Sequence, residues 1–144
     1  MFASRSRQLA ALGALVLALI LVAVPAGHAE GSLVSYDIGG FAPPMQLQIT
    51  TTGRCTLQYS LADTTTRRFV LTRRRLAELK SALEAARWSS LRRTYASPTS
   101  PGGETVFSSV TYAGRTVTVN SPARVPQRLS RVFRMLRTII WAHL

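Results

Sequence analysis

The chain has 144 residues and a formal net charge of +12, which comes from 18 Lys and Arg residues against six Asp and Glu residues. Its single cysteine, Cys55, excludes an internal disulfide, so the fold must depend on an apolar core in which this thiol is expected to be buried and inert. The charge favours polyanionic partners but identifies none, because Lys80 is the only lysine and biased codon usage would give the same arginine excess.

The first 29 residues have the layout of a secretory signal peptide. Arg5 and Arg7 precede an uninterrupted apolar run over residues 9–24, and small, helix-breaking residues lead to a cleavage site after Ala29. An uncleaved anchor is the alternative, but the run is shorter than the roughly 20 residues that a helix needs to cross a membrane. We therefore expect an exported protein, secreted or held in the periplasm or cell envelope, with no stable membrane span after cleavage.

Residues 30–144 are expected to form a single domain. This segment keeps all six acidic residues and loses only two basic ones, so its net charge is 16 − 6 = +10. A chain of this length can bury roughly two-thirds of its unfolded surface without disulfides or metal.

Strand patterns dominate the first half of this domain. Residues 33–38 alternate between apolar and polar, and two further alternating runs, 45–50 and 55–60, flank a short glycine-containing turn and so predict a β-hairpin. A polar loop at 63–66 and a short strand over 68–71 are expected next.

The sequence then changes to the period of a helix. Thr72 suits the N-cap of this helix, which is expected to end near residues 88–90. A loop over 96–104 and a second hairpin, formed by 105–112 and 115–120, follow it. The apolar stripe of this helix consists of Leu76, Leu79, Leu83 and Ala86.

A final helix is expected with Pro126 in its first turn. The order of elements predicts an α+β fold, an antiparallel sheet of about five or six strands with two helices packed on one face. The apolar stripe of the final helix consists of Leu129, Val132, Phe133, Leu136, Ile139 and Ile140, and its other side carries Arg131, Arg134 and Arg137.

Residue types that carry out catalysis are sparse in this domain. His143 is its only histidine and lies second from the end, where chains tend to fray. The acidic residues are scattered, and neither a Gly-x-Ser-x-Gly motif nor a phosphate-binding glycine-rich loop occurs. We therefore expect no enzyme, no catalytic residue, no metal site and no cofactor.

Basic residues cluster near the predicted start and end of the first helix. The candidate basic patch consists of Arg73, Arg74, Arg75, Arg92 and Arg93. Cations at a helix N-terminus oppose the positive end of the helix dipole, so a contact with an anionic surface and a plain solvated face both remain open. Export and the lack of interleaved aromatic residues make nucleic acid an unfavoured partner.

The stretch Gly39-Gly40-Phe41-Ala42, followed by two prolines, is expected to end one strand and to start the next. Its four residues are also the candidate binding loop. Phe41 would insert into a partner from this stiff loop, or it would fold back onto the core as most aromatic side chains do.

The order of short motifs resembles that of the emfourins, small bacterial proteins that inhibit thermolysin-like zinc metallopeptidases. The matching features are a strand running into the Gly39-Gly40 stretch, a helix with Leu76-x-x-Leu79-x-x-x-Leu83, a hairpin over 107–119, and a closing Val125-Pro126 followed by Leu136-x-x-Ile139. The hairpin over 45–60 is extra, and Gly103-Glu104 stands where the pattern has an Asp. The resemblance implies a non-catalytic α+β domain that blocks a peptidase, with 39–42 as its best-matching segment.

Two functional hypotheses follow. The first is a secreted, non-catalytic binding domain that acts by occlusion, with a secreted metallopeptidase or another protein as its partner. The second is an envelope-associated domain whose arginine-rich face binds an anionic polymer or a membrane surface.

Overall fold

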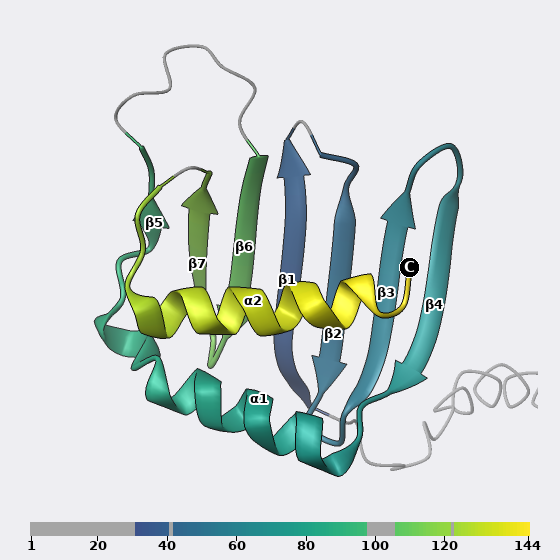
Figure 1. Ribbon diagram of the computed structural model, residues 1–144, viewed down its shortest axis with the longest axis horizontal. Helices are drawn as coiled ribbons and strands as arrows, with labels where there is room; N and C mark the ends of the chain where they lie inside the picture. The colour runs from purple at the N-terminus through teal and green to yellow at the C-terminus, as the bar shows by residue number, and fades with distance from the viewer. Residues whose placement is uncertain (1–30, 41, 98–105, 122) are drawn as a thin grey trace, which may run out of the picture.

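In the described part of the chain, seven strands form one sheet in the spatial order β4-β3-β2-β1-β6-β7-β5, and helix α2 crosses one face of it from the β7 side to the β3 side (Figure 1). Helix α1 runs beside α2 near one end of the strands.

This computed structural model describes residues 31–40, 42–97, 106–121 and 123–144. The predicted signal peptide, Phe41 and most of the predicted loop 96–104 lie outside these ranges. The elements are β1 Ser32–Gly40, β2 Met45–Thr50, β3 Arg54–Ser60, β4 Thr64–Val70, α1 Arg73–Ala85, the 3₁₀ turn η1 Trp88–Ser90, β5 Thr94–Tyr95, β6 Val106–Tyr112, β7 Arg115–Asn120 and α2 Gln127–Trp141.

The α+β class is confirmed, but the sheet differs from the prediction in two respects. The described residues form seven strands instead of five or six, and the sheet is mixed because β5 pairs with β7 in the parallel direction. Strand β5 has only two residues, too few to show a period in the sequence. Strand β4 begins at Thr64, inside the predicted polar loop, because an edge strand can carry polar residues on both of its faces.

Both predicted hairpins are present, and their turns show why. Gly53 has a φ of 89°, and its N–H donates to the Thr50 carbonyl at 3.0 Å. In the β6–β7 turn, Ala113 and Gly114 have φ angles of 50° and 73°, the two consecutive positive values of a type I′ turn. This turn type matches the twist of paired antiparallel strands, so it favours the observed register.

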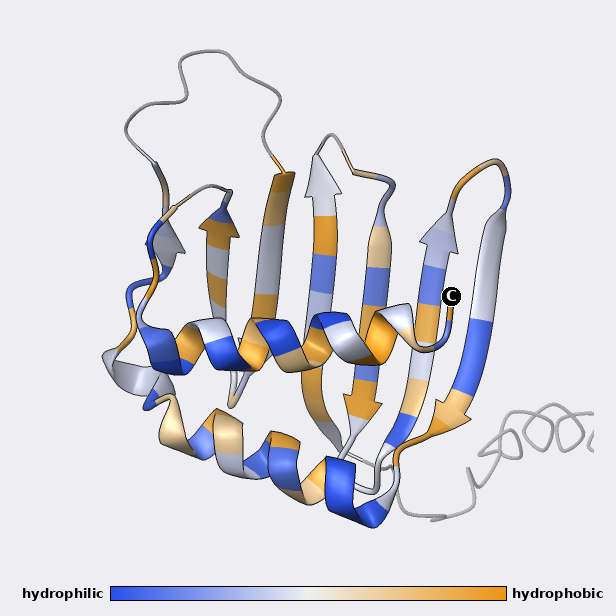
Figure 2. Cartoon of the chain, viewed as in Figure 1, coloured by the Kyte–Doolittle hydropathy of each residue, from blue (hydrophilic) through white to orange (hydrophobic). Residues whose placement is uncertain are grey.

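The hydrophobic core lies between α2 and one face of the sheet. Tyr36, Leu47, Leu57, Val110 and Val117 project from five strands and are all fully buried. The Tyr36 and Phe133 rings meet edge to face, with centroids 5.6 Å apart. Figure 2 shows α2 alternating between hydrophilic and hydrophobic residues along its length. The predicted stripe of α2 is buried in full: Leu129, Val132, Phe133, Leu136, Ile139 and Ile140.

The opposite face of the sheet carries mainly polar side chains. Hydroxyl groups pair across β6 and β7, Ser109 with Thr118 at 2.8 Å and Thr111 with Thr116 at 2.7 Å. In the described part of the chain, no helix is long and apolar enough to span a bilayer.

Side-chain contacts fix both ends of α1. The Thr72 hydroxyl accepts from the Arg75 N–H at 3.2 Å, which confirms the predicted N-cap. At the other end, Arg128 donates from Nε to the Ala86 carbonyl at 2.9 Å and from Nη2 to Ser90 Oγ at 3.1 Å. Arg128 therefore connects the start of α2 to the end of α1.

Pro126 occupies the N-cap of α2, one residue before its predicted place in the first turn.

Gly39 lies in β1, opposite Phe107 of β6, and Gly40 is the last residue of the strand, so the glycine pair ends β1 as the sequence predicted. A Cβ atom on Gly39 would stand 2.6 Å from Phe107 Cζ, closer than atoms can approach. The glycine therefore makes room for the Phe107 ring to cover the polar face of β1.

Replacing Gly39 by alanine should force the Phe107 ring off the strand. We expect Gly39→Ala to lower the free energy of unfolding by about 1–2 kcal/mol in urea denaturation. In the background of Phe107→Ala, the same substitution should cost much less, because the clash is gone. An equal cost in both backgrounds would contradict this role for Gly39.

Candidate functional site

The β1–β2 loop, residues 41–44, contains part of the predicted binding loop. Gly40 ends β1 with a φ of 87°, which favours glycine and turns the chain out of the strand. Ala42 is half-buried, and the two prolines that follow are exposed. Of the four predicted residues, Gly39 and Gly40 belong to β1, Ala42 lies in the loop, and Phe41 lies outside the described residues.

Neighbouring strands anchor the loop on both sides. Gly40 pairs with Val106 of β6, and the Ser60 N–H at the end of β3 donates to the Pro44 carbonyl at 3.2 Å. The turn between β3 and β4 lies at the same end of the sheet (Figure 1), and its Leu61 is 74% exposed. The loop therefore emerges from a stiff base next to an exposed apolar side chain.

A hollow of about 250 Å³ adjoins this loop. Asp37, Gln46 and Gln58 stand in register across β1, β2 and β3, and Gln46 Nε2 donates to Asp37 Oδ1 at 2.9 Å. These carboxylate and amide groups offer hydrogen bonds to a partner that docks on the loop. The lining residues are Asp37, Ile38, Pro44, Met45, Gln46, Gln58, Tyr59, Ser60 and Thr64.

The structure does not bring the predicted basic patch together. Arg73, Arg74 and Arg75 are exposed at the start of α1, and Arg74 Nε forms an ion pair with Glu78 Oε1 at 3.0 Å. Arg92 and Arg93 follow η1, beyond the other end of the helix (Figure 1). A 13-residue helix is about 20 Å long, so the patch divides into two separate groups.

Two arginines that the sequence did not single out support the fold. Arg115 donates from its Nη1 and Nη2 atoms to the carbonyls of Ser89 and Leu91, and its own carbonyl accepts from Trp88 Nε1 at 2.8 Å. Arg128 donates from Nε to the Ala86 carbonyl. These contacts join residues more than 20 positions apart, so no local pattern in the sequence could have revealed them.

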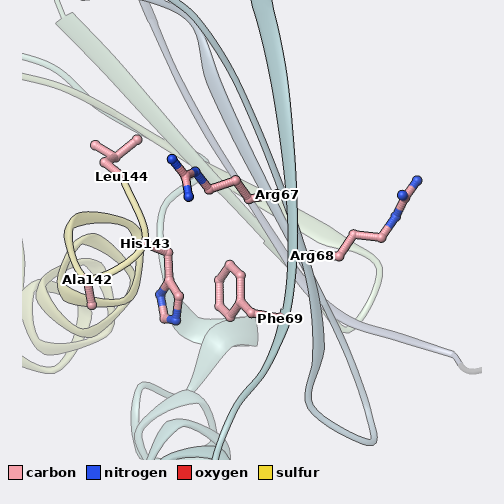
Figure 3. Close-up of a pocket in the computed structure, with 6 residues that line it drawn as sticks. All are labelled: Arg67, Arg68, Phe69, Ala142, His143 and Leu144. Atoms are coloured by element: carbon pink, nitrogen blue, oxygen red, sulfur yellow. The ribbon is translucent and has the colours of Figure 1, made fainter.

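A second hollow, of about 420 Å³, lies between β4 and the C-terminus (Figure 3). The His143 ring stacks on Phe69 with centroids 3.6 Å apart, and its Nδ1 lies 2.8 Å from the Ile139 carbonyl. Arg67 extends toward Leu144, whereas Arg68 points away on the other side of β4. The stack on Phe69 therefore holds the end of the chain against β4.

Burial shifts the pKa of two core groups. Burial raises the pKa of the Cys55 thiol to about 11, and its Sγ donates to the Gly53 carbonyl at 3.5 Å. Burial also raises the pKa of Tyr36, which the Ser108 hydroxyl and the charge of Arg137 partly offset. Cys55 is therefore a neutral core residue, as its alternating apolar neighbours predicted.

Within the described ranges, His, Cys, Asp and Glu side chains form no group of three that could hold a metal ion. Comparison of the chain with models of known protein families gave no match, and comparison with curated proteins gave none either.

Cys55 should react slowly with thiol reagents. At pH 8, a thiol with a pKa of about 11 has about 100-fold less thiolate than one with the ordinary value of 9.0. We expect the native protein to label with Ellman's reagent at least about 100-fold more slowly than the protein in denaturant. Native labelling at the denatured rate would contradict the buried position.

Stability should depend on pH for the same reason. The Cys55 thiol has a pKa near 9 in the unfolded chain and about 11 in the folded protein. The neutral thiol therefore contributes fully to the free energy of unfolding below pH 9, and this contribution is lost as the pH rises through 11.

Proposed function

We propose that residues 30–144 form an exported, non-catalytic binding domain that contacts another protein through the β1–β2 loop. The observation that carries this proposal is the anchoring of the loop by Gly40–Val106 pairing and by the Ser60–Pro44 hydrogen bond. A loop whose two ends are held by neighbouring strands loses less conformational entropy when it binds. Phe41, placed between the turn glycine and the two prolines, is the proposed anchor side chain.

The proposed target is a thermolysin-like metallopeptidase, which the domain would block by occlusion. This target rests on the resemblance to the emfourins in the Gly39–Ala42 stretch and in the order of the helices and the second hairpin. The exposed Leu61 and the adjoining polar hollow would extend the contact beyond the loop.

A second candidate function is binding to an anionic polymer or membrane of the cell envelope. Its support is the charge of the sequence: residues 30–144 hold 16 basic residues and six Asp or Glu residues, an excess of ten basic side chains. The exposed groups at Arg73–Arg75 and at Arg92–Arg93 are the predicted contacts.

Inhibition of a thermolysin-like peptidase by the purified domain 30–144 tests the first function. Contacts that depend on a buried aromatic side chain are insensitive to salt, whereas surface charge contacts weaken as salt rises. We expect the inhibition constant to change less than about threefold between 50 and 300 mM NaCl. Phe41→Ala should weaken inhibition by at least about tenfold, as the loss of an anchor residue does.

Trp141→Ala serves as the matched control, because it removes an exposed aromatic residue from α2, away from the loop. Inhibition should survive this substitution. If the folded wild-type domain does not inhibit, that peptidase is rejected as the target. Equal losses in both variants would reject the loop as the contact.

A further inference from the structure

The outer face of α2 combines arginines with an exposed tryptophan. Arg131, Arg134 and Arg137 follow one another at spacings of three residues, and Trp141 lies seven residues, or two turns, after Arg134. All four are exposed, and Trp141 is 68% accessible to solvent. They form a strip about 15 Å long on the side of the helix that faces away from the core. We call these four residues the α2 strip.

No acidic residue neutralises this strip from its own element. The sequence from 105 to 144 contains six arginines and neither Asp nor Glu. The described carboxylates belong to other elements: Asp37 hydrogen-bonds on the polar face of the sheet, Asp63 lies in the β3–β4 turn, and Glu78 is paired with Arg74 on α1. Glu84, the last of them, is also on α1. The strip therefore presents positive charge to a partner.

The two tryptophans of the chain differ sharply. Trp88 is 5% exposed and donates its indole N–H to the Arg115 carbonyl, as expected of a buried tryptophan. Trp141 contributes little to the core. A large aromatic surface left in water is stabilised by a partner that covers it, and tryptophan favours membrane interfaces because one end of its ring is apolar and the other polar.

The surface beyond Trp141 has the same character. Leu144 is 38% exposed and lines the C-terminal hollow together with Arg67 of β4 (Figure 3). The Phe69–His143 stack fixes this end of the chain, so an apolar side chain and another arginine lie beside the C-terminal hollow.

We propose that the α2 strip docks the domain onto a membrane rich in anionic lipid, with the arginines on the headgroups and Trp141 in the interface. This proposal rests on the second candidate function and gives it a different site from the predicted arginine groups. A membrane accounts for both features of the strip, because charge alone would suit a soluble polyanion while the tryptophan gains from an apolar layer. Each basic residue close to an anionic surface strengthens binding about fivefold.

Vesicle binding by the domain 30–144 tests the proposal. Vesicles of phosphatidylglycerol and phosphatidylcholine in equal parts should bind the wild-type domain, and pure phosphatidylcholine vesicles should not. The triple variant Arg131→Gln/Arg134→Gln/Arg137→Gln should bind about 100-fold more weakly in sedimentation. The matched control Arg73→Gln/Arg74→Gln/Arg75→Gln removes the same charge from α1 and should weaken binding less than about fivefold.

Trp141 supplies an independent readout. Because Trp88 is already buried, a shift of tryptophan emission to shorter wavelength on vesicle binding would come from Trp141. We expect this shift in the wild-type domain and in the α1 control, and no shift in Trp141→Phe. Circular dichroism of each variant establishes that it is folded.

Four results would overturn the proposal. Equal losses in the two triple variants would mean that net charge, and not the strip, drives binding. Binding without a shift of Trp141 emission would mean that the strip does not enter the interface. Binding to soluble polyphosphate but not to vesicles would reject the membrane as the partner, while the second candidate function would survive. Failure to bind polyphosphate or vesicles would reject both the membrane proposal and the second candidate function, and it would leave the loop proposal untouched.

Discussion

The packing of the α2 apolar stripe against one face of the sheet is the interaction on which the rest of the structure depends. α2 crosses strands that are far apart in the sequence, and each buried side chain of Leu, Ile, Val or Phe type contributes roughly 1.5–3 kcal/mol. The edge-to-face contact of Tyr36 with Phe133 fixes the helix over β1, near the centre of the sheet. Without α2, the exposed apolar face would have only α1 to cover it, so strand pairing and helix docking depend on each other.

This one-sided core determines where partners can bind. The sheet buries its large apolar residues beneath α2 and leaves mainly polar groups on the opposite face, where the Phe107 ring covers Gly39. The β1–β2 loop projects from the end of the sheet, and the α2 strip lies on the side of α2 that faces away from the sheet. Both surfaces rest on rigid elements, so a protein partner at the loop and a membrane at the strip would occupy different sides of the domain.

The sequence predicted the elements whose patterns are local. Alternation over 45–60 and over 106–120 predicted the two hairpins, Thr72 predicted the cap of α1, and the spacing from Leu129 to Ile140 predicted the buried stripe. It missed β5, because two residues show no period, and the start of β4, because an edge strand tolerates threonines. The Gly39–Phe107 contact and the Arg128–Ala86 bond join distant positions that no local pattern reveals. Trp141 could have been found, since its seven-residue spacing from Arg134 places it outside the apolar stripe.

α2 divides into a buried side that holds the fold and an exposed outer side. Equilibrium urea unfolding of Leu136→Ala and Arg134→Ala, measured side by side, tests this division. Leu136 is fully buried, so its truncation should lower the free energy of unfolding by about 2–5 kcal/mol. Arg134→Ala should stay within about 0.5 kcal/mol of the wild type. Comparable losses in the two variants would contradict the account, because the outer face would then be part of the folded core.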